Sequence, residues 1–296
     1  MRFARADHSA GGRGGRGRAM PGWVVGLLAL LASAPEAAGR TLPAWRSLEP
    51  GLDLAVFPAT RAASPEDAFI RIVRIDPERY SLVLLNASAR SEGRTRTAKG
   101  WAAQHGLSAA INASMYQIDL RRSVSLMRSR EHVNNPRLSK DKAVLAFDPL
   151  AAGVPPVQII DRECQDFDAL SRSYGTLVQS IRMVSCTGRN VWAPQPKAWS
   201  TAAIGLDRRG RVLFIHARAA HTTHDLIESL LELPIDLKNA MYTEGGPEAQ
   251  LYVRGGGEEM EFTGAIEGAT SGSPMLAWPV PNVIGALPIA SSPRRP

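Results

Sequence analysis

The sequence predicts an α+β domain with a mixed, largely antiparallel β-sheet flanked by a few helices. Short runs of β-branched and other apolar residues outnumber the segments with helical periodicity. Strands and helices do not alternate strictly, as they would in a doubly wound parallel sheet. The chain has 296 residues, of which 44% are apolar. It can therefore build the core of one globular domain, or at most of two small ones.

The first predicted strands lie in the N-terminal third of the chain. Residues 68–74 and 80–85 are β-type runs on either side of the turn signal Asp76-Pro77-Glu78, so we expect them to form a hairpin. A short helix is expected at residues 97–105, because the glycine that follows is a usual helix stop. Residues 108–111 then predict a buried strand.

The middle of the chain continues this pattern. Residues 142–147 and 157–160 predict strands, and residues 166–174 predict a helix. Residues 201–206 and 212–216 flank Asp-Arg-Arg-Gly, a sequence that is typical of a hairpin turn. We therefore expect these last two strands to pair with each other.

The clearest helical pattern covers residues 223–233. Thr222 can cap this helix with Asp225 three residues later, and the apolar residues that follow recur at helical spacing: Leu226, Ile227, Leu230, Leu231 and Leu233. Strands are expected at residues 239–243 and 250–254. The chain beyond them, from residue 264, is rich in Gly, Pro and Ser and is expected to follow the surface.

The N-terminus has the pattern of a secretory signal peptide over residues 1–39. An arginine-rich start precedes an apolar run at residues 23–32, and small residues follow it. That run is too short to span a hydrocarbon core of roughly 30 Å comfortably, so we do not expect a permanent anchor. Cleavage after Ala34 or nearer Gly39, and a start at Met20, are open alternatives.

The basic charge of the chain lies partly in that segment. The whole sequence carries a formal charge of +7, and residues 1–39 account for +3 of it. Residues 40–296 therefore carry +4, which is too diffuse to track a phosphate backbone, so nucleic acid is not an expected partner. We expect residues 40–296 to form the working domain, periplasmic or secreted after export, with no stable membrane span.

Cys164 and Cys186 are the only cysteines and lie 22 positions apart. In an exported chain we expect them to form a disulfide, which stabilises by roughly 3 kcal/mol in the chain-entropy model. Neither cysteine has another Cys or a His at metal-ligand spacing, so a metal site is not favoured. A nucleophilic cysteine is the remaining alternative.

Histidine-based chemistry has little support in the sequence. His221 and His224 are three residues apart but have no third ligand nearby, so we favour residues of a capping turn over metal ligands. No H-E-x-x-H, G-x-S-x-G or P-loop pattern occurs. No metal site and no cofactor are predicted, and a requirement for a divalent cation stays open.

Three predicted strand ends carry small or polar residues. Asn112-Ala113-Ser114-Met115-Tyr116 follows a buried strand, and Gln179-Ser180-Ile181-Arg182 lies in an apolar strand. Thr243-Glu244-Gly245-Gly246-Pro247-Glu248 closes the strand that begins at residue 239. The two glycines let the backbone approach a ligand closely, and their N–H groups can bind an anion. Taken singly, each motif is also compatible with a plain turn.

In this order the segments resemble the phosphodiester glycosidase family, over roughly residues 69–253. A family strand that ends in Asn corresponds to Asn112 and the residues after it, and a central Gln-Ser corresponds to Gln179-Ser180. A Thr/Arg-Thr-Ala-Ile-Gly strand corresponds to residues 200–205, and the Asn-Leu-Asp-Gly-Gly signature corresponds to the segment around Glu244. The chain departs from the pattern in two places, because Asn-Gly-Gly-Phe becomes Asn-Ala-Ser-Met and the signature Asp becomes Glu244.

The resemblance implies hydrolysis of the bond between a sugar anomeric carbon and phosphate in an envelope or extracellular glycan. Such a reaction needs a carboxylate near an oxocarbenium-like carbon and cationic or N–H groups near the departing phosphate. The implied catalytic residues are Glu244, as base or electrostatic stabiliser, with Asn112 and Arg182. The implied substrate-binding residues are Tyr116, Arg128, Arg130, Gln179, Ser180, Thr201, Gly245 and Gly246. The alternative is a non-catalytic glycan- or phosphate-binding protein on the same fold.

Several of these residues also have a structural interpretation. Arg182 binds phosphate or pairs with a buried acid, whereas Arg128 and Arg130 bind phosphate or stay solvated. Asn112 holds the substrate or caps a turn through its side chain. Tyr116 packs against the sugar ring or belongs to the core.

Overall fold

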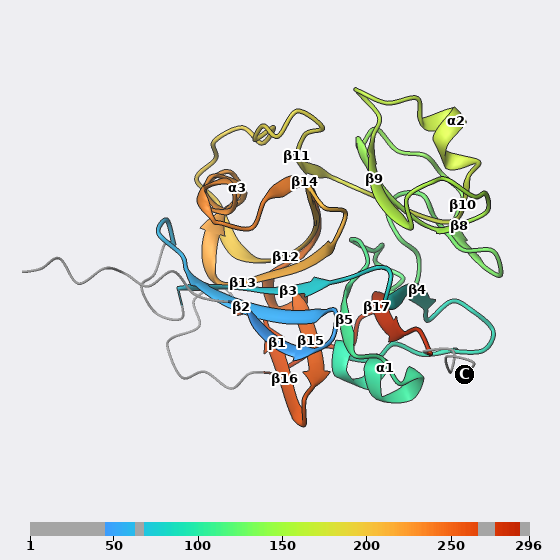
Figure 1. Ribbon diagram of the computed structural model, residues 1–296, viewed down its shortest axis with the longest axis horizontal. Coiled ribbons are helices and arrows are strands. Elements are labelled where there is room, and N and C mark those ends of the chain that lie inside the picture. Colours follow the sequence, from blue (N-terminus) through green and yellow to red (C-terminus); the bar gives the residue numbers. More distant parts are fainter. Residues whose placement is uncertain (1–44, 63–67, 266–275, 291–296) are drawn as a thin grey trace, which may run out of the picture. The chain divides into compact units, whose positions relative to one another are not determined.

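A seven-stranded antiparallel sheet carries the main acidic candidate. The computed structural model describes residues 45–62, 68–265 and 276–290 (Figure 1), and the predicted signal peptide lies outside them. The strand order of this sheet is β1-β2-β3-β13-β12-β14-β11. Its strands are β1 (Arg46–Glu49), β2 (Leu52–Pro58), β3 (Phe69–Ile75), β13 (Val212–Thr222), β12 (Ala198–Asp207), β14 (Leu237–Gly245) and β11 (Arg182–Val184).

Two five-stranded sheets complete the β-structure. The second sheet has the order β7 (Val133–Asn135), β6 (Met127–Arg128), β10 (Tyr174–Ser180), β8 (Ala143–Pro149) and β9 (Val157–Asp161). The third has the order β16 (Glu258–Thr263), β15 (Gln250–Gly255), β5 (Ala109–Asn112), β17 (Asn282–Pro288) and β4 (Tyr80–Asn86). Every pair between these described strands is antiparallel.

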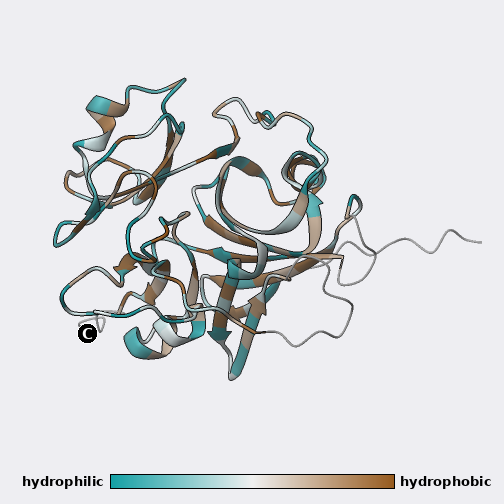
Figure 2. Cartoon of the chain, turned by 180° about the vertical axis from the view of Figure 1, so that it is seen from behind, coloured by the Kyte–Doolittle hydropathy of each residue, from teal (hydrophilic) through white to brown (hydrophobic). Residues whose placement is uncertain are grey.

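One apolar cluster joins all three sheets. Phe214 of the first sheet, Phe147 of the second and Ile111 of the third are buried in it. A second cluster includes Ile215 of the seven-stranded sheet and Leu230 of α3 (Thr223–Glu232). Figure 2 shows that hydrophobic residues concentrate in the strands, whereas the connecting loops are largely hydrophilic. The predicted class, α+β with a largely antiparallel sheet in a single domain, is confirmed.

The helices with clear local signals form as predicted. The first helix, α1 (Ala98–His105), begins at an N-cap threonine whose side chain accepts a hydrogen bond from the Gly100 N–H, and Gly106 ends it in the left-handed conformation. The Thr222 hydroxyl likewise accepts the Asp225 N–H at the start of α3. The predicted helix at residues 166–174 is shorter, because α2 (Phe167–Ser171) ends before β10 begins at Tyr174.

The predicted hairpin between residues 68–74 and 80–85 is wrong. Both strands exist, but β3 lies between β2 and β13 of the first sheet, while β4 pairs with β17 in the third. A strand has only two edges, and both edges of β3 are occupied by other partners. The N–H groups of Arg79 and Tyr80 bond to the Asp76 carbonyl, so this turn directs the chain into a different sheet.

The C-terminal expectation also needs a correction. Residues 266–275 lie outside the described part, but residues 282–288 form β17, a buried strand between β4 and β5 rather than a surface segment. Gly285 makes this possible, because a Cβ at that position would lie 2.9 Å from one methyl of Leu107 and closer still to the other. The short apolar run of β17 is hard to recognise in the sequence, because glycines and prolines surround it.

The chain passes directly from the second sheet into the first near the candidate residues. Only Ile181 separates Ser180, the last residue of β10, from Arg182, the first of β11. The Ile181 carbonyl accepts a hydrogen bond of 2.9 Å from the Tyr242 N–H of β14. The end of β10 is therefore fixed against the strand that carries Glu244. Among the described helices, none has the length and apolar character needed to cross a membrane.

Candidate active site

Four segments from three sheets meet around the end of β14. Ser114 donates its hydroxyl to the Gln179 carbonyl at 3.1 Å, which joins the loop after β5 to β10. Ser180 donates its hydroxyl to the Tyr242 carbonyl, which joins β10 to β14. In β12, Thr201 pairs with Gly245. The predicted residues gathered here are Asn112, Tyr116, Gln179, Ser180, Thr201, Glu244, Gly245 and Gly246.

Glu244 is the second-to-last residue of β14. The register with β12 shifts between Ala202 and Ala203, so Thr243 is an extra residue and Glu244 lies opposite Ala202. Its Oε1 accepts the Gly245 N–H at 3.0 Å. Burial raises the pKa of this carboxyl to about 7; the Gly245 hydrogen bond opposes the shift, and the charge of Glu248 adds to it. A carboxyl that titrates near neutral pH is suited to proton transfer.

Glu248 is a second acidic residue that sequence reasoning passed over. It ends the short 3-10 helix η1 (Gly246–Glu248), which begins at a glycine with a φ of +67°. Its charge raises the pKa of Glu244, Tyr116 and Tyr242, so all four residues share one electrostatic environment. Its place four residues after Glu244, across a Gly-Gly-Pro turn, is the signal that could have identified it.

Asn112 holds the turn that presents the two carboxylates. Its side-chain Nδ2 donates to the Glu248 carbonyl at 2.9 Å, and its Oδ1 accepts the Gln250 N–H at 2.7 Å. The side chain is 1% exposed. The amide therefore satisfies backbone groups on both sides of Ala249, in the manner of the turn cap that the sequence left open.

His216 supports the same turn from β13. Its Nε2 lies 3.2 Å from the Ala249 carbonyl, and the ring is fully buried. Burial, together with the charge of Arg71, lowers the pKa of His216 to about 3. The imidazole is therefore neutral, and Nε2 is its donor to Ala249.

Aromatic side chains lie near Glu244. Tyr116 is half-buried, and its pKa is raised by burial and by the charges of Glu244 and Glu248. Tyr242 lies two residues before Glu244, and the Trp192 ring lies 5.7 Å from its ring. Aromatic rings beside a carboxylate suit a sugar, which presents C–H faces and hydroxyl edges.

Gln179 and Thr201 differ in how their polar atoms are satisfied. Gln179 Oε1 accepts the Ser139 N–H at 2.9 Å, and its Nε2 donates to the Asp141 carbonyl at 2.7 Å. The amide is buried and bound to the backbone, so this geometry shows a structural use of it. Thr201 Oγ1, in contrast, is buried without a hydrogen-bond partner in the described residues.

Arg182 belongs to a cluster around the disulfide. Its Nη1 contacts both oxygens of the buried Asp161 at 2.7 and 2.8 Å, and its Nη2 bonds to Glu163 at 2.6 Å. Pairing with a buried acid, one of the two predicted alternatives, is the one observed. The predicted catalytic role of Arg182 gains no support from this geometry, because both terminal nitrogens contact carboxylates.

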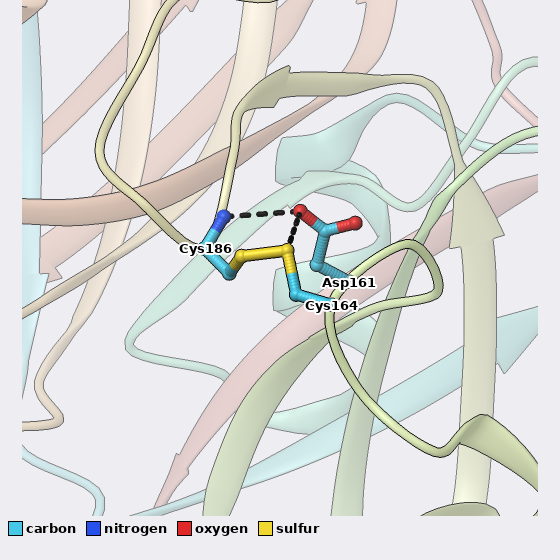
Figure 3. A group of neighbouring side chains, drawn as sticks. All are labelled: Asp161, Cys164 and Cys186. Atoms are coloured by element: carbon cyan, nitrogen blue, oxygen red, sulfur yellow. Dashed lines mark hydrogen bonds between the residues drawn. A yellow bond between two sulfur atoms is a disulfide. The ribbon is translucent and has the colours of Figure 1, made fainter.

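The predicted disulfide between Cys164 and Cys186 is present (Figure 3). Asp161 lies against it, and its Oδ2 accepts the Cys186 N–H at 3.0 Å. Burial opposes the ionised form of Asp161, but this N–H and Arg182 outweigh it and hold the pKa below its ordinary value. Asp161 and the two sulfurs lie close enough to suggest metal ligands, but the sulfurs are bonded to each other and offer no thiolate.

Arg128 and Arg130 lie toward the opposite end of β10 from Ser180. Arg128 Nη1 donates to the Gly175 carbonyl at 3.2 Å, and Arg130 makes a bidentate ion pair with Asp148. Gly175 precedes Ser180 by five residues, which is roughly 16 Å along an extended strand. The structure therefore does not bring these two arginines together with Glu244.

Arg218 is a guanidinium that the sequence analysis did not select. It follows His216 by two residues in β13, and its Nη1 lies 3.3 Å from the Thr263 carbonyl. Gly264, the residue after Thr263, has no Cβ, and a Cβ at this position would collide with the Gly246 carbonyl. Arg218 therefore lies near the turn that follows Glu244, on the side of the third sheet.

This fold is that of a phosphodiester glycosidase. The family model described as phosphodiester glycosidase matches residues 105–287, which is more than half of the chain, and the chain belongs to that family. The matched region includes all four segments of the site and the disulfide. The predicted family resemblance is thereby confirmed.

Two solved structures have the same fold. One is the zebrafish N-acetylglucosamine-1-phosphodiester alpha-N-acetylglucosaminidase catalytic domain, auto-inhibited by its pro-peptide, with a TM-score of 0.59 and 10% identity over 82% of this chain and 86% of that chain. The other is a hypothetical protein from Synechocystis, with a TM-score of 0.54 and 14% identity over 83% of this chain and 64% of that one. No curated protein matches the sequence. At these identities the likeness shows the fold alone.

Proposed function

We propose that this protein hydrolyses the bond between a sugar anomeric carbon and the oxygen of a phosphodiester, with Glu244 as the central residue. The observation that carries the proposal is the half-buried Glu244 carboxyl, whose pKa of about 7 lies near the working pH of a general base. It lies in the segment that resembles the family's glycine-rich signature, and Glu248, Tyr116 and Tyr242 share its electrostatic environment. Membership of the phosphodiester glycosidase family supplies the reaction class.

The chemistry assigns the ionised form of Glu244 to the reaction. A phosphate group departs readily, so little help from a general acid is needed at the leaving oxygen. Glu244 accepts a proton from water while the water oxygen forms a bond to the anomeric carbon. The bond from that carbon to the phosphate oxygen breaks, and its electron pair leaves with the phosphate. The negative charge of Glu244 and Glu248 also stabilises the positive charge that develops on the sugar.

Arg218 is the proposed cation for the departing phosphate. A guanidinium can bind two phosphate oxygens at once. Arg218 lies near the Gly246 turn, whereas Arg128 and Arg130 lie toward the far end of β10. Gly245 and Gly246 remain the proposed backbone contacts, since glycine permits close approach of a ligand.

Export is part of the proposal. The signal-peptide pattern and the disulfide are both typical of proteins that function in an oxidising compartment. The substrates in view are therefore sugar phosphodiesters of envelope or extracellular glycans. The zebrafish relative is named for N-acetylglucosamine-1-phosphodiester, which makes that compound the first substrate to assay.

The decisive experiment compares wild type with Glu244→Gln on sugar-1-phosphodiesters. We expect the variant to lose at least about a hundredfold in kcat, because a general base contributes roughly 10²- to 10⁴-fold. In wild type, kcat/KM should rise with pH to a plateau above about 7, since the ionised carboxyl is the active form. Glu131→Gln, on the exposed loop after β6, is the matched control.

Unchanged turnover in Glu244→Gln would remove the central claim. A wild-type protein that binds these glycans and never releases sugar would instead favour the non-catalytic binding protein. A pH profile that falls between 6 and 8 would assign the protonated carboxyl to the reaction and contradict the base role.

A further inference from the structure

The indole N–H of Trp199 in β12 and the hydroxyl of Tyr242 in β14 lie close together beside Gly245. Trp199 Nε1 is buried without an acceptor of standard geometry in the described residues, and its N–H acts on the Tyr242 hydroxyl, for whose own proton no acceptor is found there. Leaving a buried donor unsatisfied costs roughly 1–3 kcal/mol, so most such groups have a partner in the protein, in water or in a ligand. A Tyr242 hydroxyl that faces the Trp199 N–H keeps its own proton to donate, and this proton, beside a candidate catalytic carboxyl, points to a ligand.

Gly245 brings these donors together. A Cβ at this position would lie 2.9 Å from Trp199 Nε1 and still closer to the Tyr242 hydroxyl oxygen. Both rings can therefore close over the backbone only because the residue after Glu244 has no side chain. The Trp192 ring packs against Tyr242 at 5.7 Å and limits its orientation.

The negative charges near Tyr242 favour an uncharged oxygen as the acceptor of a hydrogen bond from its hydroxyl. Glu244 and Glu248 both act on Tyr242, so a phosphate oxygen at the same place would be repelled by two carboxylates. Burial, with these charges, holds the pKa of Tyr242 above its ordinary range, although the Trp199 N–H opposes the shift. The hydroxyl therefore keeps its proton throughout the neutral range and remains a donor.

We infer that the Tyr242 hydroxyl donates a hydrogen bond to an uncharged oxygen of the sugar, and that Trp199 Nε1 positions this hydroxyl. This inference rests on the proposed function and deepens it, because it assigns the sugar to the Tyr242 side of Glu244. The phosphate then lies on the Arg218 side. The ligand oxygen is a ring hydroxyl or the carbonyl of an acylamino substituent, since both accept a hydrogen bond and carry no charge.

The test is a double-substitution cycle that combines the Tyr242→Phe variant with substrates changed at a single position of the sugar. Wild type and variant are assayed on sugar-1-phosphate methyl diesters that differ at one ring position, with hydroxyl, acetamido or deoxy. On substrates that keep the acceptor oxygen, Tyr242→Phe should raise KM about tenfold. On the analogue that lacks it, the variant should equal wild type, because the hydrogen bond is already absent. Trp199→Phe should reduce the same discrimination partially.

Controls separate this subsite from a folding defect and from the proposed function. Tyr80→Phe removes another buried tyrosine hydroxyl, one that bonds to Glu49, and should leave sugar discrimination intact. Melting temperatures report on folding. Binding of non-hydrolysable phosphonate analogues to wild type and Tyr242→Phe, measured by calorimetry, does not depend on turnover.

Each outcome then has one meaning. If wild type shows no turnover but discriminates between hydroxyl and deoxy phosphonates through Tyr242, the proposed function fails and the subsite stands. If Tyr242→Phe changes KM equally for every sugar, or discriminates between the phosphonates as wild type does, the subsite is overturned.

Discussion

At the scale of single residues, Glu244 links the proposed catalysis to stability. Its folded-state pKa of about 7 lies above the ordinary value of 4.5. Between these two values the folded protein binds more protons than the unfolded chain, so stability falls as pH rises. This contribution is fully present below about pH 4.5 and is lost as pH rises through 7. The carboxyl that the proposed reaction needs in its ionised form thus destabilises the fold in that form.

Glu244→Gln should therefore be more stable than wild type at pH 8 and similar to it at pH 4.5. A pKa raised from 4.5 to about 7 corresponds to roughly 3 to 4 kcal/mol, since each pKa unit is worth about 1.4 kcal/mol. Urea unfolding at the two pH values measures the difference. Glu131→Gln, whose carboxyl is exposed, should show no such pH dependence. Equal stability of Glu244→Gln and wild type at pH 8 would contradict the raised pKa.

The sequence could indicate Glu244 because its signature is local, with an acid followed by two glycines. It could not indicate Tyr242 or Trp199, which meet only through strand pairing and through the missing Cβ of Gly245. The arginines show the same limit, because the sequence indicates them as candidates but not the partners that they meet in the fold. For Arg182 the sequence left phosphate binding and pairing with a buried acid open, because its partner Asp161 belongs to another sheet, 21 positions earlier in the chain.

At the scale of elements, the turn from β14 to β15 is held by a few specific contacts. Asn112 bonds to backbone groups on both sides of Ala249, and His216 bonds to Ala249 itself. Asn112→Ala should remove both of its bonds and leave a buried N–H and a buried carbonyl unsatisfied. We expect a loss of about 2 to 4 kcal/mol in unfolding free energy and a lower kcat, because Glu248 is no longer held.

Asn239→Ala is the matched control for this turn. Asn239 is also a buried asparagine, but its Nδ2 bonds to the Ile159 carbonyl in the second sheet. It should cost stability in chemical unfolding while kcat of the folded protein changes little. If Asn112→Ala affects stability alone and leaves kcat unchanged, the turn does not position the carboxylates.

The elements also show which signals in the sequence are sufficient to predict a helix or a strand pairing. The caps at Thr97 and Thr222 lie within a few residues of the helices they begin, so both helices were predictable. The β12–β13 hairpin was predictable because its turn residues set the pairing. The choice of neighbours for β3 and β4 was not, because it depends on strands distant in the sequence.

At the scale of the whole molecule, the Cys164–Cys186 bond and the Arg182 ion pairs join two sheets. Cys164 follows β9 of the second sheet, and Cys186 follows β11 of the first. Replacing both cysteines by serine should lower the unfolding free energy by roughly 3 kcal/mol, the chain-entropy value for a loop of this length. Denaturant unfolding of wild type with and without reductant gives a second measurement. Identical midpoints in all samples would show that the bond contributes nothing to stability.

The same bond makes the chain between the two cysteines a covalent loop that contains α2 and β10. Arg172, exposed in the turn between these two elements, is a natural point of attack for trypsin. Cleavage there would open the backbone but release no fragment, because the sulfur bridge still joins the halves. On a gel the nicked protein should run as one band until a reductant separates it into two, with the Glu244 side retained in the C-terminal piece.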